Sequence, residues 1–303
     1  MNDPASPYGY LRTKYGLALR YGHWPYPGHA PKGTILILQG RSEYMEKYEE
    51  TVAALHDRRL DVFSFDWRGQ GLSDRMLPDR EKGFVRHYGE YLEDLELIMN
   101  AVIQPGMRGE LYLLAHSMGG HIGLRHLHRH GHLFTGVVLC APMIDIITRQ
   151  FPSFFARWLS RRQVAAGNPD GIVVGALRRT PFPERFRNNF WTSDRRRFER
   201  NRQRIKERPE LSAAMVTYGW VAATYDSFGA LKQAGRNHLP KIPLLFVVAE
   251  RDRVVSNRAI RKFVSGTYKA RLVVIKDARH EILQEADAQR GLFWQAFDMF
   301  IGQ

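Results

Sequence analysis

Ser117 is the residue of this chain whose surroundings predict chemistry most clearly. The apolar run from Leu111 to Ala115 is typical of a buried strand, and the residues after Ser117 repeat apolar side chains at helical spacing. A serine between such a strand and a helix lies on a sharp turn that exposes its hydroxyl, as a nucleophile requires. Gly119 and Gly120 supply the small residues that a close approach of strand and helix demands.

Strands and helices alternate along most of the chain, which predicts an α/β fold with a mostly parallel sheet covered on both faces. Residues 10–24 predict two strands joined by a turn. Apolar runs predict the other strands of an eight-stranded sheet at 34–40, 61–66, 111–116, 136–142, 242–250 and 271–277. Helical spacing predicts helices at 43–59, 84–104, 256–266 and 284–301.

The stretch 147–238 breaks this alternation. It contains short helical runs, several prolines and most of the excess positive charge, since residues 149–208 hold 16 Lys and Arg against five Asp and Glu in a chain of net charge +14. Because it falls between two predicted core strands, we predict an inserted helical cap at the carboxyl edge of the sheet, where sites of α/β proteins lie. The predicted domains are a core of residues 1–146 and 239–303 and a cap of residues 147–238.

A nucleophilic serine needs a general base, and the base needs an acid that orients it. The turn around Ser117 resembles the nucleophile elbow of α/β-hydrolases, in which the chain order is serine, acid, histidine. His280, in the loop after the last predicted strand, is the expected base, and His238 is the alternative. Asp252, in the loop after the preceding strand, is the expected acid, with Glu250 and Asp226 as competitors.

The reaction also needs an oxyanion hole, which is usually made of two backbone N–H groups. One belongs to the residue after the nucleophile, here Met118. The other is expected where LQGRSEY turns at the end of the 34–39 strand, because Gly40 permits the turn and Arg41 supplies the amide. The side chain of Arg41 has two open roles, contact with a phosphate or a salt bridge to a nearby glutamate.

Four motifs carry a family resemblance: LQGRSEYMEKY at 38–48, DWRGQGLSDR at 66–75, AHSMGG at 115–120 and HEILQE at 280–285. Together they resemble the bacterial lysophospholipases, which belong to the wider group of monoacylglycerol lipase-like serine hydrolases of the α/β-hydrolase superfamily. The resemblance covers about residues 10–145 and 240–300 and is weak in the cap. It implies a triad of serine, aspartate and histidine, and Ser117, Asp252 and His280 fall at its motif positions.

The chain departs from the family pattern at two positions. Gln39 replaces the histidine that is common before the oxyanion-hole glycine, and Ala115 replaces the glycine of the elbow. Neither replacement removes a catalytic group. Within the 66–75 motif, Asp66 and Arg68 are expected to hold the loop and to take no part in the chemistry.

Aromatic residues recur at helical spacing early in the predicted cap: Phe151, Phe154, Phe155 and Trp158. Arginines at 157, 161 and 162 give the same helix a basic side, as interfacial helices often have. We interpret the aromatic residues either as packing inside the cap, or as a substrate-binding wall for an acyl chain or a face that dips into a membrane.

Metal binding is not expected. The pairs at 126/130 and 128/132 have the spacing of helical metal ligands, but no glutamate completes an H-E-x-x-H pattern and no further ligand cluster follows. We therefore expect neither a metal nor another cofactor. Cys140 lies in a buried-strand run, and a single cysteine excludes an internal disulfide and suits a reducing compartment.

The sequence predicts a serine hydrolase that cleaves a carboxylic ester of a lipid through an acyl-enzyme, foremost a lysophospholipid, because a basic cap suits a phosphate head group. Alternatives with the same triad are a monoacylglycerol lipase, an esterase of small esters and an aminopeptidase. A non-enzymatic alternative is a basic protein with a vestigial site that binds membrane or nucleic acid.

The expected partners are a lipid or small-molecule ester and, peripherally, an anionic membrane. Residues 149–208 lack a recognised nucleic-acid motif, so no nucleic-acid partner is expected. No apolar run is long enough to span a bilayer, and the first ten residues lack the features of a signal peptide. We expect a cytoplasmic protein, with peripheral contact at the inner face of the cell membrane. The oligomeric state stays open.

Overall fold

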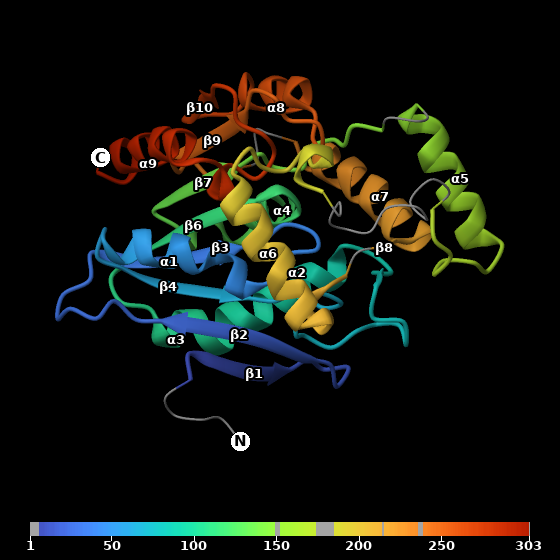
Figure 1. The fold of residues 1–303 in the computed structure, drawn as a ribbon, viewed down its shortest axis with the longest axis horizontal. Coiled ribbons are helices and arrows are strands. Elements are labelled where there is room, and N and C mark those ends of the chain that lie inside the picture. The colour runs from blue at the N-terminus through green and yellow to red at the C-terminus, as the bar shows by residue number, and fades with distance from the viewer. Residues whose placement is uncertain (1–5, 149–151, 174–184, 214, 236–238, 303) are drawn as a thin grey trace.

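The computed structural model describes residues 6–148, 152–173, 185–213, 215–235 and 239–302. These residues form a central sheet of eight strands in the order β1-β2-β4-β3-β6-β7-β9-β10 (Figure 1). The strands are β1 (Tyr8–Arg12), β2 (Ala18–Trp24), β3 (Gly33–Leu38), β4 (Leu60–Phe65), β6 (Glu110–His116), β7 (Gly136–Cys140), β9 (Leu244–Ala249) and β10 (Ala270–Ile275). Only β1–β2 and β2–β4 are antiparallel neighbours, so the predicted mostly parallel sheet of eight strands is confirmed.

The winding of the chain reverses between β3 and β6. From β3 the chain passes through α1 (Glu49–His56) to β4 on one side, whereas from β6 it passes through α4 (Ser117–His130) to β7 on the other. Because crossovers between parallel strands are right-handed, these opposite directions place α1 and α4 on opposite faces of the sheet. The carboxyl ends of β3 and β6 therefore form a topological switch point, where ligands of open α/β sheets bind.

Other helices complete the two layers: α2 (Gly89–Ile98), α3 (Gln104–Gly106), α8 (Asn257–Val264) and α9 (Asp287–Ile301). α9 lies beside α1, since the Arg58 guanidinium binds the Asp298 carboxylate and lies 4.2 Å from the Trp294 ring centre. The predicted helix at 84–104 begins later, at Gly89, and continues from Ile98 as a π-helical turn.

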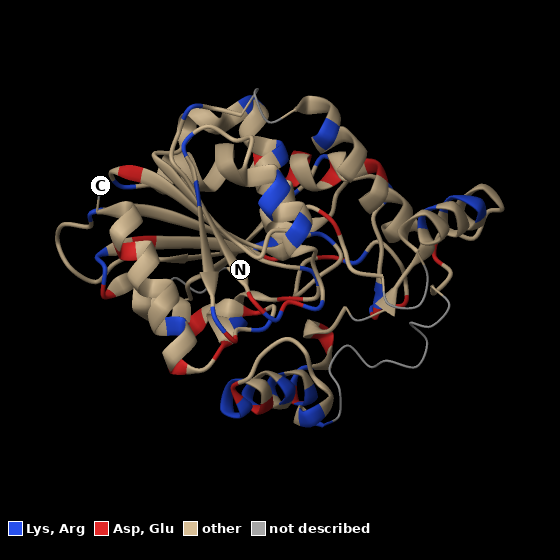
Figure 2. Ribbon diagram, turned by 90° about the horizontal axis from the view of Figure 1, so that it is seen from above, with Lys and Arg blue, Asp and Glu red and all other residues tan. Residues whose placement is uncertain are grey.

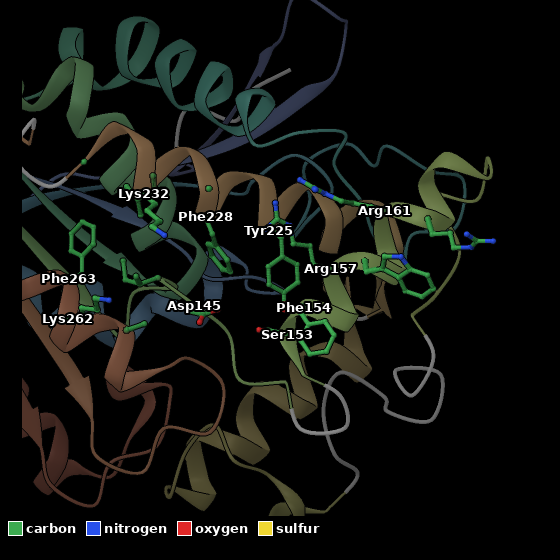
Figure 3. Close-up of a pocket in the computed structure, with 17 residues that line it drawn as sticks. Asp145, Ser153, Phe154, Arg157, Arg161, Tyr225, Phe228, Lys232, Lys262 and Phe263 are labelled. Carbon is green, nitrogen blue, oxygen red and sulfur yellow. The ribbon is translucent and has the colours of Figure 1, made fainter.

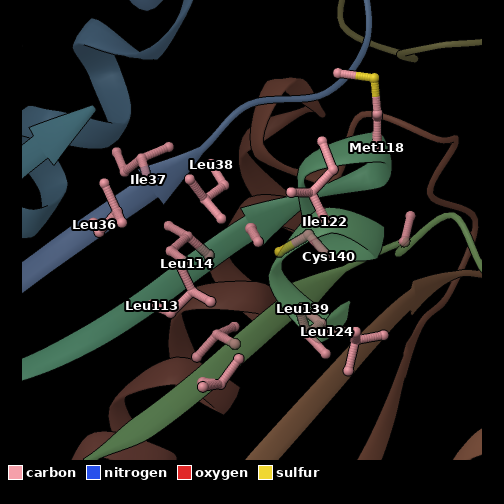
Figure 4. Close-up of a cluster of buried hydrophobic side chains, with 14 of the residues drawn as sticks. Leu36, Ile37, Leu38, Leu113, Leu114, Met118, Ile122, Leu124, Leu139 and Cys140 are labelled. Atoms are coloured by element: carbon pink, nitrogen blue, oxygen red, sulfur yellow. The ribbon is translucent and has the colours of Figure 1, made fainter. Parts of the chain in front are cut away.

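A continuous apolar core underlies the switch point. Leu36, Leu113 and Leu139 come from three adjacent strands and are each at most 1% exposed. Figure 4 shows such strand residues packed with Ile122 and Leu124 of α4. The core fixes α4 against the sheet and thereby fixes the turn at its first residue.

Residues 147–238 contain α5 (Ser153–Ala165), α6 (Arg195–Glu207) and α7 (Tyr218–Ala234). The sequence predicted no strong strand here, and among the described residues of this stretch the structure adds only the two-residue strand β8 (Met215–Val216), which pairs with β5 (Lys82–Gly83). Figure 1 shows α5 projecting away from the sheet, whereas α6 lies across it.

Lys and Arg are frequent along α6 (Figure 2), and several of its arginines pair with carboxylates of the core. Glu50 binds Arg197 at 2.8 Å and Arg200 at 2.7 Å, and Glu49 binds Arg204. Burial raises the pKa of Glu50, but the hydrogen bonds from Arg197 and Arg200 outweigh it and hold that pKa at about 2. The arginine-rich sequence of α6 is therefore mainly a structural contact, and less of the charge is available to a ligand than composition suggests.

Candidate active site

Ser117 is the first residue of α4 and lies directly after β6. Its φ of 50° falls in the left-handed region, which costs a non-glycine residue of order 1–3 kcal/mol. The backbone N–H of Met143 donates to the Ser117 carbonyl at 2.9 Å and helps to hold this turn. The predicted sharp turn between strand and helix is present, and such strain is typical of functional positions.

Ala115 fits this turn without disturbing it. The residue is fully buried, and its partners in the sheet are Leu38 of β3 and Leu139 of β7. The methyl group that replaces a glycine hydrogen therefore adds to the apolar core.

The structure brings the three predicted residues of the triad together. His280 Nε2 lies 3.0 Å from Ser117 Oγ, and His280 Nδ1 lies 2.8 Å from Asp252 Oδ2. Asp252 Oδ1 also accepts the N–H groups of Val254 and Val255 at 2.8 and 3.0 Å. This arrangement suits proton transfer from the hydroxyl to Nε2, with the opposite ring nitrogen held by the carboxylate.

Electrostatics keep Asp252 ionised. Burial raises the pKa of this carboxyl, but the charge and hydrogen bond of His280 and the two amides outweigh it, so that the pKa is lowered. Asp252 therefore remains a carboxylate that accepts the Nδ1–H of His280 and stabilises an imidazolium.

The competing residues lie elsewhere. Asp226 is exposed on α7 and pairs with Arg161, and Glu250 is exposed and accepts the N–H of Asp277 at 2.9 Å. His238, the alternative base, lies outside the described residues.

The turn after β3 is fixed on both sides of Arg41. Gly40 N donates to Glu43 Oε2 at 2.5 Å, and Ser42 N donates to Gln70 Oε1. Gln70 Nε2 in turn lies 4.0 Å from Met118 Sδ, so this side chain links Ser42, the residue after Arg41, to Met118. The Arg41 guanidinium donates to the Met215 carbonyl at 2.7 Å and lies 4.8 Å from the Trp220 ring centre.

Asp66 and Arg68 hold the loop of the 66–75 motif in place, as predicted. Asp66 accepts the N–H groups of Met45 at 3.0 Å and Leu72 at 2.9 Å, and Arg68 binds Asp94 through two contacts of 2.6 Å. Gln39 is buried and its amide nitrogen donates to Asp66 at 3.3 Å. The glutamine that replaces the family's histidine thus belongs to the same loop support.

The aromatic residues of α5 lie away from the triad. Phe154 is 72% exposed and Trp158 is 53% exposed, whereas Phe155 is half-buried and contacts the Trp158 ring. Phe151 lies outside the described residues.

An open cavity of about 1250 Å³ lies between α5, α7 and α8 (Figure 3). Its described lining includes Phe154 and Trp158 but not the triad. Ile144 and Asp145 also line the cavity. They directly follow Met143, whose amide donates to the Ser117 carbonyl. Basic side chains also line it: Arg157, Arg161, Arg162, Lys232 and Lys262.

Sequence reasoning missed the support behind the triad. His116, interpreted only as a packing residue beside the nucleophile, lies between the Glu43 carboxylate and the His280 carbonyl, at 3.0 and 3.2 Å. Glu43 falls within the 38–48 motif, so a glutamate three residues after the turn glycine was the available signal. The contact between Glu43 and His116 was not predictable, because the two residues are 73 positions apart in the sequence.

Gly119 is expected to tolerate no side chain. A Cβ there would lie 2.4 Å from the Leu38 carbonyl oxygen and 2.5 Å from that of Gln39, so the Gly119→Ala variant must shift the backbone of β3. We expect a loss of about 1–3 kcal/mol in the free energy of unfolding, measured by urea denaturation, with a fall in ester turnover.

The matched control is Gly291→Ala in α9, where an added Cβ meets nothing within 4 Å. It is expected to stabilise the protein by about 0.5–1 kcal/mol, because alanine has the higher helix propensity. Equal stability of the two variants would contradict the packing argument.

Comparison with known proteins agrees with this fold. Residues 29–287 match the family model described as serine aminopeptidase, S33, and the chain belongs to this family of α/β-hydrolases. Together with the lysophospholipase relatives described next, this match shows that the chain is a carboxylic ester hydrolase.

Individual relatives of the chain include lipid ester hydrolases. The chain is 35% identical to lysophospholipase L2 of Escherichia coli K12, over 89% of this chain and 80% of that protein. It is 28% identical to a probable lysophospholipase L2 of Haemophilus influenzae, over 94% of this chain and 88% of that protein. A soluble variant of Saccharomyces cerevisiae monoglyceride lipase has a similar fold, with a TM-score of 0.76 and 19% identity over 96% of this chain and 93% of that chain.

Proposed function

We propose that this protein hydrolyses the acyl ester of lysophospholipids through Ser117, His280 and Asp252. The observation that carries the proposal is the pair of hydrogen bonds of His280, which join its two ring nitrogens to Ser117 and Asp252. The two relatives with lysophospholipase names support the choice of a lipid ester.

In the proposed reaction, Ser117 Oγ attacks the ester carbonyl while His280 Nε2 takes the hydroxyl proton. The backbone N–H groups of Met118 and Arg41 stabilise the tetrahedral oxyanion. His280 then donates the proton to the leaving glycerophospho alcohol, which leaves an acyl-Ser117 ester. Water, deprotonated by His280, attacks that ester, and His280 returns the proton to Ser117 Oγ as the fatty acid leaves. Asp252 stabilises the imidazolium in both halves of the reaction.

We further propose that residues 147–238 act as a cap that docks on an anionic membrane through α5. Phe154 and Trp158 are exposed on that helix and line the cavity together with Arg157 and Arg162. Figure 3 shows Phe154 and Arg157 among these side chains. Exposed aromatic residues beside arginines suit an interface of acyl chains and phosphate groups. The exposure of Phe154 and Trp158, and a described cavity lining without the triad, favour contact with the lipid surface over an acyl pocket. Within the described ranges, every helix is too short or too polar to cross a bilayer.

A substrate panel tests the head-group choice. Fatty-acid release is compared for lysophosphatidylglycerol, lysophosphatidylcholine and monoacylglycerol with the same acyl chain, beside an aminoacyl p-nitroanilide. We expect a higher kcat/KM for the lysophospholipids than for monoacylglycerol and no cleavage of the anilide. A higher kcat/KM for monoacylglycerol would refute the head-group choice, and cleavage of the anilide alone would refute the lipid substrate.

Trp158→Ala is expected to weaken binding to vesicles that contain phosphatidylglycerol by roughly tenfold. The physical reason is that burying an exposed large apolar side chain is worth about 1.5–3 kcal/mol, and Trp158 is about half exposed. Vesicle co-sedimentation measures the effect. Added salt should weaken the vesicle binding of the unmodified protein and of the variant.

Tyr268→Ala is the matched control, because Tyr268 is 60% exposed and lies just before β10, at the amino edge of the sheet. It should leave vesicle binding unchanged. An equal loss of vesicle binding in Trp158→Ala and Tyr268→Ala would contradict docking through α5. So would equal binding of the unmodified protein to neutral vesicles and to vesicles that contain phosphatidylglycerol.

A further inference from the structure

His116 lies directly before Ser117, is 4% exposed and has both ring nitrogens engaged. Nδ1 lies 3.0 Å from Glu43 Oε2, and Nε2 lies 3.2 Å from the carbonyl oxygen of His280. The two imidazole rings are close, with 4.9 Å between the centres of His116 and His280.

The partners of His116 decide its protonation. A backbone carbonyl only accepts, so Nε2 must carry a proton to bond with the His280 oxygen. Glu43 also only accepts here, because its carboxylate already takes hydrogen bonds from Gly40 N at 2.5 Å, Tyr48 Oη at 2.7 Å and Lys47 Nζ at 2.6 Å. Nδ1 must therefore carry a proton as well, and an imidazole with protons on both nitrogens is a cation.

The charges of the buried cluster also favour a protonated His116. Lys47 Nζ lies 2.6 Å from both Glu43 and Glu281, and the three side chains are at most 9% exposed. Two carboxylates and one ammonium leave one negative charge without compensation, which is costly in a buried site. A protonated His116 makes the group neutral.

We propose that Glu43 holds His116 as a buried imidazolium and that this pair positions the oxyanion turn and the His280 loop around Ser117. Glu43 binds the N–H of Gly40 in the oxyanion turn, and His116 binds the carbonyl of His280. Lys47 joins the same carboxylate to Glu281, the residue after His280. Glu43 and His116 are thus positioning residues, and their place in catalysis rests on the function proposed above.

The groups that face His116 come from three parts of the chain: Glu43, Lys47 and Tyr48 after β3, Cys140 on the paired strand β7, and His280 and Glu281 after β10. Burial lowers the pKa of His116, but the charge and hydrogen bond of Glu43 and the charge of Glu281 outweigh it, so the pKa is raised. Because the pKa is higher in the folded protein, protonation of His116 stabilises the fold fully below pH ~6.5. That contribution is lost as the pH rises through the folded-state pKa.

NMR of protein labelled with ¹⁵N-histidine tests the charge directly at pH 7.5, without any activity measurement. We expect His116 to show two nitrogen-bound protons and the ¹⁵N shifts of an imidazolium. Its signals are assigned by their loss in His116→Gln, or by contact with the His280 ring in the unmodified protein. A neutral ring with one proton would overturn the proposal while leaving the proposed function intact.

Glu43→Gln tests the positioning role. The variant removes the negative charge, so the imidazolium signals should disappear, and kcat for a p-nitrophenyl ester should fall roughly 10- to 100-fold with little change in KM. Unchanged kcat in a folded variant would overturn the positioning role. If this variant fails to fold, His116→Asn and His116→Gln replace it.

The His116 variants separate the two hydrogen bonds. A glutamine amide reaches the place of Nε2 and keeps a donor for the His280 carbonyl, whereas an asparagine amide reaches only the place of Nδ1. We therefore expect the larger fall in kcat for His116→Asn, and an equal or smaller fall would overturn the link to His280. Glu46→Gln is the matched control, because Glu46 is a buried carboxylate three residues after Glu43 that pairs with Arg20. It should keep the imidazolium signals and kcat, and their loss would overturn the assignment to Glu43.

Discussion

Ser117→Ala is expected to lower kcat for ester substrates by roughly 10⁴- to 10⁶-fold while leaving the fold intact. The hydroxyl is the only group that the substitution removes, and its hydrogen bond to His280 at 3.0 Å is the contact through which it would be deprotonated. Without a nucleophile, the remaining acceleration comes from substrate binding and the oxyanion hole alone. Fatty-acid release and labelling by a fluorophosphonate, followed by mass spectrometry, measure the loss.

Ser265→Ala is the control for this experiment, since Ser265 is exposed after α8 and its hydroxyl binds only a local carbonyl at 3.0 Å. It should retain full activity and full labelling. Substantial turnover or labelling in Ser117→Ala would show that another residue is the nucleophile and would falsify the proposed mechanism.

Asp252→Asn is expected to lower kcat by roughly 10⁴-fold with a smaller effect on KM. The asparagine keeps the shape of the side chain, but its amide can donate to His280 Nδ1 and so favours the tautomer with the proton on Nε2. That tautomer cannot accept the proton of Ser117, and the neutral amide no longer stabilises the imidazolium. Steady-state kinetics over a pH series measure the effect.

Two other acidic residues give sharp controls. Glu250→Gln and Asp226→Asn remove the carboxylates that competed with Asp252 on sequence grounds, and neither contacts His280 in the structure. Both variants should retain kcat. A loss in either that matches the loss in Asp252→Asn would mean that the acid has been assigned to the wrong residue.

Much of the fold was predictable because its signals are local. Buried parallel strands appear as apolar runs, and β3, β4, β6, β7, β9 and β10 coincide with such runs within a few residues. The elbow was predictable for the same reason, since the strand, Ser117 and the glycines of α4 are contiguous. His280 and Asp252 followed from their places after the last two strands, because the carboxyl ends of parallel strands meet at one edge.

The role of the basic charge was not predictable from composition. The sequence shows a run of arginines at 195–208, but it does not show that Glu46, Glu49 and Glu50 lie opposite them. Pairing across about 150 residues depends on how α6 lies against the core. The structure therefore favours α5 over the rest of residues 147–238 as the candidate lipid contact, because basic and aromatic residues of this helix line one cavity.

The sequence by itself determined the class of fold, the nucleophile turn and the order of the triad, because periodicity and chain order encode them locally. Only the tertiary structure decided which carboxylate meets His280, how Gln70 links Ser42 of the turn after β3 to Met118, and that Glu43 and His116 lie behind the site. Those contacts join segments that are far apart in the chain, and a few ångströms of packing decide whether buried polar groups find partners.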